Sequence, residues 1–301
     1  MNKIKYLLAV DGGGTKITAQ IIELASGIKY STAGGQASLH NDFQTALSNI
    51  EQVINDLYLQ SKAKSGEVLA VMGLAGGGSS VLSKRLLTAL ELGCGIKFAK
   101  LHVYSDAITS LYGANNGQPV AIVALGTGAV GARLNNHGDT QLVGGWGFLV
   151  DDFGSGARLG LSAVQCLLDE IDQFSQPQSL LTRKLSEQIG ATREQLNAWL
   201  YEARAVDYAR FTYLVFELQN DCKIAELLLQ KHAKQVERLI NKTRAQSQLP
   251  VMLTGGLAAI TLPLLSAAIQ QLIIPKQGDS LSGALILAQQ NLHIFLDRTN
   301  Q

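Results

Sequence analysis

The first third of the chain alternates short apolar runs with glycine and polar breaks. Three such runs between residues 4 and 33 predict three consecutive strands, with turns at 12–14 and 26–27. Beyond them, helices and strands are expected to alternate. A helix over 42–62 precedes a strand at 68–72 and a loop over 73–78. A second helix, capped by Ser79 or Ser80, then precedes a strand at 101–104 and a helix from 105 to about 113.

The same strand plan then recurs. Strands are expected at 120–125, 129–134 and 140–143, and a tight turn, Gly126-Thr127-Gly128, joins the first two. An internal duplication of two α/β halves is the simplest explanation of this repeat. The rest is expected to be mainly helical, with helices over 157–171 and 221–247 and a closing helix over 282–296. Thr192 and Gln195 have capping-box spacing. Two strands are expected within this region, at 251–253 and 272–274.

Composition limits the protein classes that fit. A chain of 301 residues with 47% hydrophobic and 16% charged residues can form two ordinary domains. The net charge of +1, without any basic run, gives no indication of a nucleic-acid partner. We also find no signal-peptide pattern and no apolar stretch of membrane-spanning length, which is about 20 residues. Cys94, Cys166 and Cys222 show no metal or disulfide spacing and are expected to be buried apolar residues, so a cytoplasmic protein is predicted.

The turn after the first strand has the composition of a phosphate site. Glycines allow backbone N–H groups to gather and face outward, which creates a cradle for an anion. Thr15 adds a hydroxyl donor and Lys16 a cation, while Asp11 suits a Mg²⁺ ion between its carboxylate and a phosphate. The candidate phosphate-binding residues are Gly12, Gly13, Gly14, Thr15 and Lys16. An ordinary glycine-rich hairpin turn is the alternative.

The turn at Gly126-Thr127-Gly128 repeats this chemistry, and two such turns predict a nucleotide held by both halves. The letters from 126 to 131 also fit G-x-G-x-x-G. A strand rather than a helix is expected after Gly128, and no acidic residue stands at the ribose position, so a dinucleotide fingerprint is rejected. The chain likewise has no G-x-x-x-x-G-K-[ST] motif.

Two further positions combine an acid with a strand end or a glycine loop. Asp106 stands where a strand ends and a helix begins, so it either assists the helix cap or accepts a hydroxyl proton during phosphoryl transfer. Asp152 lies in a glycine-rich loop and could contact sugar hydroxyls, although its neighbour Asp151 competes for that role. Trp146 either stacks on a sugar ring or belongs to the core.

An ordered set of motifs resembles one family. It comprises Asp11 to Lys16, Gly73-Leu74-Ala75-Gly76, Asp106-Ala107, Gly126-Thr127-Gly128, Gly144-Gly145-Trp146-Gly147, Asp152 to Gly156, Thr254-Gly255-Gly256 and Pro275 to Ala284. The set is similar to the BadF/BadG/BcrA/BcrD-type ATPases, most of all to the amino-sugar kinases among them. The resemblance implies an α/β fold of two ribonuclease-H-like, actin-like ATPase domains over 1–115 and 116–284, with an interdomain cleft for ATP and sugar. The closing helix, about 285–301, is expected on the first domain.

The resemblance also implies roles for single residues. Asp106 would be the catalytic base for the sugar 6-hydroxyl, and Asp11 would orient Mg²⁺. ATP would be bound by Gly12, Gly13, Gly14, Thr15, Lys16, Gly126, Thr127, Gly128, Gly255, Gly256 and Gly283. The sugar would be bound by Asp106, Gln36, Ser38, Gly145, Trp146 and Asp152. Gln36 and Ser38 stand where relatives often have Asn, and Phe153 replaces a common acid or amide.

The main hypothesis is therefore a kinase that uses ATP and Mg²⁺ to phosphorylate the 6-hydroxyl of N-acetylglucosamine or glucosamine. The expected partner is a small amino sugar, with neither nucleic acid nor membrane, and a homodimer stays open. One alternative is an ATPase that activates a dehydratase through a cysteine-bound cluster, but no cysteine adjoins Gly126-Thr127-Gly128. The other is a non-catalytic sugar or nucleotide sensor.

Overall fold

A computed structural model describes residues 4–93 and 95–299 of the chain. The chain divides into two compact units. The first unit takes the chain up to Pro119 and again from Lys276, and the second unit spans Val120–Pro275. The first unit is therefore assembled from both ends of the sequence.

The first unit contains a five-stranded sheet in the order β3-β2-β1-β4-β5. The strands β1 (Tyr6–Gly12), β2 (Ile17–Glu23) and β3 (Lys29–Gly34) form the predicted antiparallel meander, and β4 (Val68–Leu74) and β5 (Lys100–Ser105) continue it in parallel. The predicted loop at 73–78 begins too early. Gly73 and Leu74 still belong to β4, because they pair with Tyr104 and Ser105 of β5.

The helices of the first unit start at short polar side chains, and of the predicted alternatives Ser79 and Ser80 the cap is Ser79. Asp42 caps α1 (Phe43–Ser61), accepting the N–H groups of Gln44 and Thr45 at 3.1 Å each. Ser79 caps α2 (Ser80–Thr88), which continues as one π-helical turn, η1 (Ala89–Gly93), and Ser105 caps α3 (Asp106–Ala114). The last helix, α12 (Ser280–Thr299), starts two residues earlier than expected.

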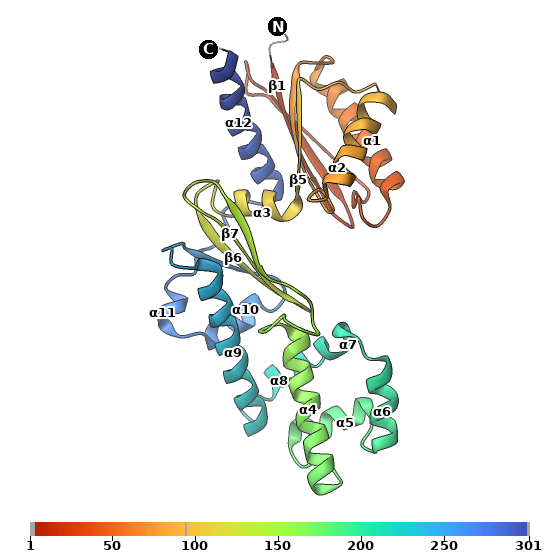
Figure 1. The fold of residues 1–301 in the computed structure, drawn as a ribbon, viewed down its shortest axis with the longest axis vertical. Coiled ribbons are helices and arrows are strands. Elements are labelled where there is room, and N and C mark those ends of the chain that lie inside the picture. The colour runs from red at the N-terminus through yellow and green to blue at the C-terminus, as the bar shows by residue number, and fades with distance from the viewer. Residues whose placement is uncertain (1–3, 94, 300–301) are drawn as a thin grey trace. The chain divides into compact units, whose positions relative to one another are not determined.

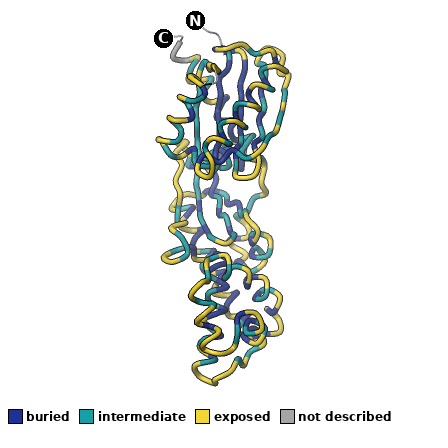
Figure 2. The backbone as a smooth tube through the Cα atoms, turned by 90° about the vertical axis from the view of Figure 1, so that its right-hand side faces the viewer, coloured by how far each residue is buried: buried dark blue, intermediate teal, exposed yellow. Residues whose placement is uncertain are grey.

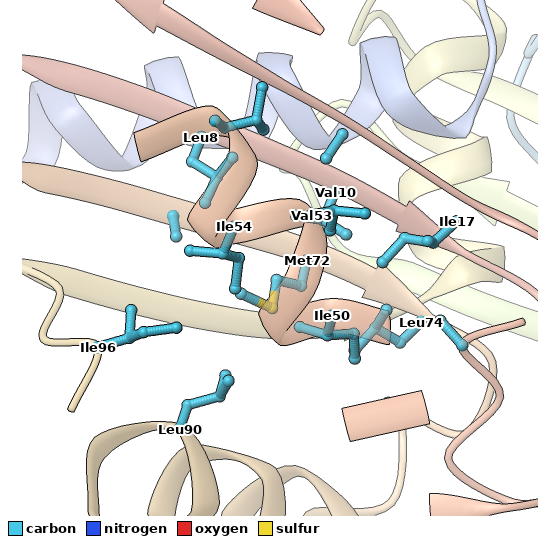
Figure 3. Packing of buried hydrophobic residues seen from close by; sticks show 14 of the residues in the cluster. Leu8, Val10, Ile17, Ile50, Val53, Ile54, Met72, Leu74, Leu90 and Ile96 are labelled. Carbon is cyan, nitrogen blue, oxygen red and sulfur yellow. The ribbon is translucent and has the colours of Figure 1, made fainter. Parts of the chain in front are cut away.

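Side chains alternate between the two faces of this sheet, and both faces are covered. Leu8 and Val10 of β1 pack with Ile50 and Ile54 of α1 in one apolar cluster, which Figure 3 shows with Met72 beside the helix. The opposite face of β1 meets α12, drawn in dark blue beside the strand in Figure 1. Every residue of β4 and every residue of β1 except Asp11 is accordingly buried. Figure 2 shows how buried and exposed stretches alternate along the backbone. This sheet therefore forms a rigid base for the loops at its edge.

The second unit repeats the plan with four strands, β6 (Val120–Leu125), β7 (Ala129–Leu134), β8 (Thr140–Gly144) and β9 (Val251–Thr254), in the order β8-β7-β6-β9. The prediction of a strand at 272–274 is wrong. Only a single bridge forms, between Val251 and Ile273. Pro275 follows at once and has no N–H group with which to extend the pairing.

Helices make up the rest of the second unit. They are α4 (Gly156–Phe174), α5 (Leu180–Ile189), α6 (Arg193–Glu202), α7 (Ala205–Ala209), α8 (Thr212–Glu217), α9 (Lys223–Arg244), α10 (Ala258–Thr261), η2 (Leu262–Leu264) and α11 (Ala267–Gln270). The predicted capping box of Thr192 and Gln195 is confirmed at the start of α6. The helices from α4 to α8 share an apolar core with the beginning of α9, and the later part of α9 packs on the sheet.

The cysteine prediction is confirmed only in part. Cys222 is buried and Cys166 is half-buried, and both are free thiols, while Cys94 lies outside the described residues. Within residues 4–93 and 95–299, no helix has the length and apolar character needed to cross a membrane.

A buried histidine in the second unit makes its stability depend on pH. His232 of α9 is 2% exposed, its Nε2 lies 3.0 Å from Thr261 Oγ1, and its Nδ1 has no partner in the described structure. Burial lowers the pKa of His232 from 6.5 to about 4. Below pH 6.5, His232 therefore binds a proton in the unfolded chain but stays neutral in the folded chain. The stability contributed by the neutral, buried His232 is fully present above pH 6.5 and is lost as the pH falls towards 4.

We expect His232→Gln to flatten this pH dependence. Urea unfolding at pH 7 and pH 4.5 measures the loss, and the wild-type loss should exceed that of the variant by about 2–3 kcal/mol, since each pKa unit is worth 1.36 kcal/mol. Equal losses in the two proteins would show that His232 is not responsible.

Candidate functional site

The turn between β1 and β2 presents its tip to solvent. The N–H of Gly13 donates to the Lys16 carbonyl at 3.0 Å, and the N–H of Ala37 donates to the Gly13 carbonyl at 2.8 Å. These bonds hold the turn from both sides. Gly14, Thr15 and Lys16 are exposed at the tip, as an anion site requires.

The glycines of this turn are present for different reasons. A β-carbon at Gly12 would lie 2.6 Å from Leu74 Cδ2 and 2.8 Å from Ala37 Cβ, so packing excludes a side chain. At Gly13 and Gly14 the nearest atoms would be 3.9 Å and 3.8 Å away, and neither residue has a left-handed φ. The fold therefore does not need glycine at 13 and 14, whereas a ligand that approaches the backbone closely would.

Asp11, near the end of β1, is half-buried close to this turn. Burial is the main cause that raises the pKa of Asp11, and a hydrogen bond from the Ser280 hydroxyl opposes it. The charges of Asp279 and Asp106 raise the pKa further, and Lys16 lowers it. The structure thus brings Asp11, Asp106 and Lys16 together, as predicted, and adds Asp279 and Ser280, which the sequence analysis did not assign. Asp279 and Ser280 lie in the motif from Pro275 to Ala284, and Asp279 has helix-capping spacing to Ser282, whose N–H it accepts.

Asp106 is the first residue of α3. Its Oδ1 accepts the N–H of Ala107 at 2.9 Å, and its carbonyl lies 3.1 Å from Thr109 Oγ1. Thr109 is fully buried, and its Oγ1 lies 2.7 Å from the Oγ of Ser280. A pair of hydroxyls therefore connects the helix that carries Asp106 to the residue that bonds Asp11.

Two glycines allow this connection by bringing the backbones of α3 and α12 into contact. A β-carbon at Gly283 would overlap the carbonyl oxygen of Thr109, and one at Gly113 would overlap that of Asp279. This contact explains a glycine at 283 by packing alone. The nucleotide contact that the sequence analysis assigns to Gly283 stays a prediction.

The loop after β3 adjoins the same turn, because Ala37 packs against Gly12. Ser38 is 4% exposed, and its hydroxyl oxygen accepts the N–H of Asn41 at 3.4 Å. Gln36 is half-buried, and its carbonyl accepts the side-chain amide of Asn49 at 2.7 Å. Of the two predicted sugar contacts, the side chain of Gln36 is thus the more accessible.

The turn of the second unit is fixed to the start of α4. The N–H groups of Gly156 and Ala157 donate to the carbonyls of Gly126 and Thr127 at 2.8 and 3.1 Å. Gly126 has no atom within 4 Å of a built β-carbon and no left-handed φ, so, like Gly13 and Gly14, it is not required by the fold. Gly255 differs, because its φ is +90° and a β-carbon there would overlap Leu125.

A pocket of about 280 Å³ opens beside this turn. Gly126, Thr127 and Gly256, all predicted to bind ATP, contribute to its wall. Thr212 and Tyr213 of α8 line it as well, and the sequence analysis missed them because nothing local marks two helical residues about 85 positions away. A pocket of nearly 300 Å³ is close to the lower size limit of small-molecule sites.

The adjacent acids Asp151 and Asp152 point to different places. Asp152 has a φ of +59°, is 9% exposed, and its Oδ2 would lie 3.0 Å from a β-carbon at Gly128. The Asp151 carboxylate accepts the backbone N–H of Trp146 at 3.3 Å, beside Gly145. Trp146 is 82% exposed, so it does not belong to the core.

The oxygen ligands near the first turn fit a magnesium ion. Mg²⁺ commonly takes one or two carboxylates, water and substrate phosphates, and the carboxylate of Asp11 beside an anion turn fits such an ion. Among the described residues, no three His, Cys, Asp or Glu side chains gather as a metal-binding group.

Comparison with known proteins defines the class. The chain belongs to the BadF/BadG/BcrA/BcrD ATPase family, whose model matches residues 8–286. A solved structure from Chromobacterium violaceum, described as a "Putative N-acetylglucosamine Kinase", has 30% identity and a TM-score of 0.68 and covers 95% of this chain and 99% of its own. This match and the two repeated sheets confirm the predicted α/β fold of two ribonuclease-H-like units.

Two curated relatives carry amino-sugar kinase names. The N-acetyl-D-glucosamine kinase of Dictyostelium discoideum is 27% identical over 276 residues, covering 84% of this chain and 85% of the relative. The glucosamine kinase GspK of Vibrio cholerae is 27% identical over 293 residues, covering 96% and 98%.

Gly283→Ala tests whether the close contact between α3 and α12 is the reason for a glycine at position 283. The added methyl group must separate α3 from α12, so we expect a loss of about 3 kcal/mol in unfolding free energy, measured with urea. Gly93→Ala is the control, because a β-carbon there meets open space. A variant as stable as the wild type that bound ATP more weakly would instead favour a nucleotide contact.

Proposed function

We propose that this chain is an ATP-dependent kinase that phosphorylates the 6-hydroxyl of an amino sugar, either glucosamine or N-acetylglucosamine. The observation that carries the proposal lies within the first unit. There, Asp11 and Asp106 lie close enough to interact beside a turn whose tip glycines the fold does not require. The family and the amino-sugar kinase names of the relatives support the same reaction.

Phosphoryl transfer depends mainly on positioning and charge stabilisation. In the proposal, Gly12 and Gly13 shape the turn, and its exposed tip of Gly14, Thr15 and Lys16 binds phosphate oxygens. Asp106 accepts the proton of the sugar hydroxyl. Asp11 orients Mg²⁺, with Ser280 holding its carboxylate in place. Bound Mg²⁺ supplies positive charge that offsets the charge on the transferred group.

The second unit supplies the remaining contacts in this proposal. Within the second unit, the turn Gly126-Thr127-Gly128 is proposed to bind phosphate oxygens, and the pocket with Gly255 and Gly256 nearby to take the adenosine, where Tyr213 offers an aromatic ring. Both Mg²⁺ and the assignment of ATP to these residues are proposals that rest on the chemistry of the side chains and on the family.

The sugar contacts are proposed for the loop after β8 and for Gln36. Trp146, with its exposed side chain, offers a flat apolar face for a sugar ring. Gly145, whose φ is +72° and which packs against Val130, sets the backbone of the loop and is proposed to contact the sugar through that backbone. Asp151 bonds this loop directly, whereas Asp152 is buried beside Gly128. Asp151 is therefore the stronger candidate for a sugar hydroxyl, and Asp152 for support of the phosphate turn.

Asp106→Asn tests the assignment of the base. The amide keeps the shape but cannot accept a proton, so we expect kcat to fall by about 10²–10⁴-fold while sugar affinity measured by calorimetry changes little. Asp169→Asn, an exposed acid on α4, is the control. Unchanged turnover, measured by coupled ADP release, would remove Asp106 from the mechanism.

Gly14→Ala tests whether a ligand meets the first turn. The methyl group has space in the free protein, so stability should be preserved, and the KM for ATP should rise about tenfold, equivalent to about 1.4 kcal/mol. Gly93→Ala again provides the control for a harmless methyl group. An unchanged KM for ATP would contradict a phosphate at this tip.

A panel of glucose, glucosamine, N-acetylglucosamine and N-acetylmannosamine identifies the acceptor, because a few contacts to the 2-substituent decide such a preference. ADP release with an amino sugar supports the kinase. Sugar binding without ADP release from any of the four would contradict it and favour a sensor.

A further inference from the structure

The second unit has another pocket, of about 310 Å³, between the loop after β8 and α9. Trp146, Val150 and Phe153 form its apolar side, and Arg238 and Lys242 of α9 contribute charge. It shares no lining residue with the pocket beside Gly126 and Thr127. None of the roles discussed above uses its α9 side.

The two cations share one face of α9. Arg238 and Lys242 are four residues apart, so their side chains lie one helical turn apart, and both are exposed. Within the described part of the chain, neither forms an ion pair. Two neighbouring cations without an acidic partner create a local positive field that attracts an anion.

The polar neighbours in the pocket are mostly occupied. Asp151, its one acid, accepts the Trp146 N–H with its carboxylate, and its carbonyl accepts Arg158 Nε at 2.7 Å. Gln235 Oε1 accepts the N–H of Gly154 at 3.2 Å, which leaves the side-chain NH₂ of Gln235 as a donor. With one carboxylate against two cations, the pocket has a net positive charge.

The opposite side is apolar and unusually exposed. Trp146 is 82% exposed, Val150 71% and Phe153 44%, all within one short loop. A flat ring stacked on the indole would remove apolar surface from water, and the guanidinium of Arg238 suits bidentate recognition of a carboxylate or phosphate. The pocket therefore offers a ring site beside an anion site.

We propose that this pocket binds a sugar ring that bears an anionic group, with the ring on Trp146 and the carboxylate or phosphate on Arg238 and Lys242. The inference rests on the proposed function in its use of Trp146 as the sugar contact. Two sources share this chemistry, an amino-sugar acceptor with a carboxylate substituent and an already phosphorylated amino sugar. The anion would add affinity that a neutral amino sugar lacks.

The test compares Arg238→Gln/Lys242→Gln with a matched control, Lys231→Gln/Lys234→Gln, which removes two exposed cations of α9 that do not line the pocket. Calorimetry measures the binding of N-acetylmuramic acid, glucosamine 6-phosphate, N-acetylglucosamine and inorganic phosphate to the full-length protein. We expect the pocket variant to weaken binding of the two anionic sugars at least tenfold and to change that of N-acetylglucosamine less than twofold. The control variant should bind like the wild type.

Each outcome decides a separate point. An anionic sugar that releases ADP, with a KM raised by the pocket variant, identifies the acceptor source. One that binds and inhibits without being phosphorylated, in a manner that requires Arg238 and Lys242, identifies the phosphorylated source. Equal losses for neutral and anionic sugars, or no loss for either anionic sugar, would overturn the inference.

The proposed function can fail independently. If no amino sugar releases ADP while the anionic sugars still bind through Arg238 and Lys242, the kinase assignment fails and the pocket stands. If glucosamine or N-acetylglucosamine is phosphorylated but no anionic sugar depends on these cations, the kinase stands and the pocket assignment fails.

Discussion

The backbone contact between α3 and α12 is the constraint on which the first unit's candidate site depends. With only hydrogen atoms at Gly113 and Gly283, the two helices approach until each glycine meets a carbonyl oxygen of the other. That approach places Thr109 Oγ1 2.7 Å from Ser280 Oγ, and Ser280 in turn bonds Asp11. Any larger residue at the crossing would separate the hydroxyls and release the carboxylate they hold.

This arrangement also concentrates negative charge. Asp11, Asp106 and Asp279 come from three separate segments of the first unit, and the charges of Asp106 and Asp279 disfavour ionisation of Asp11. Lys16 and the Ser280 hydroxyl compensate in part. A site with surplus negative charge beside an anion turn suits a cation between carboxylates and phosphate, which gives the proposed Mg²⁺ a physical reason.

Local signals carried most of the fold prediction. The caps at Ser79 and Thr192 depend on residues three positions away, so the sequence alone revealed them. The strands of both meanders likewise followed from short apolar runs. The end of β4 and the absence of a strand at 272–274 depended instead on pairing partners and on Pro275, which a single run does not reveal.

The candidate site was predictable where a motif marks it and unpredictable where contacts define it. The acids at 11 and 106 and both glycine turns were found from the sequence. The sequence does not distinguish Gly12 from Gly14. In the structure, Leu74 leaves no space for a side chain at Gly12, whereas Gly14 has room for one. Nor does the sequence show that Asp151 and Asp152 diverge, because this follows from the left-handed backbone at 152. Ser280 and Tyr213 became candidates for the site only from their tertiary contacts in the structure.

The position of α12 also has a consequence for biosynthesis. One face of β1 and β4 is covered by this helix, which the ribosome makes after the second unit, so that face has no cover while the second unit is translated. During this interval the nascent sheet exposes a strongly apolar surface, which is a target for chaperones and a risk for aggregation. The second unit is continuous in sequence and can fold earlier, so the first unit is completed only after the second.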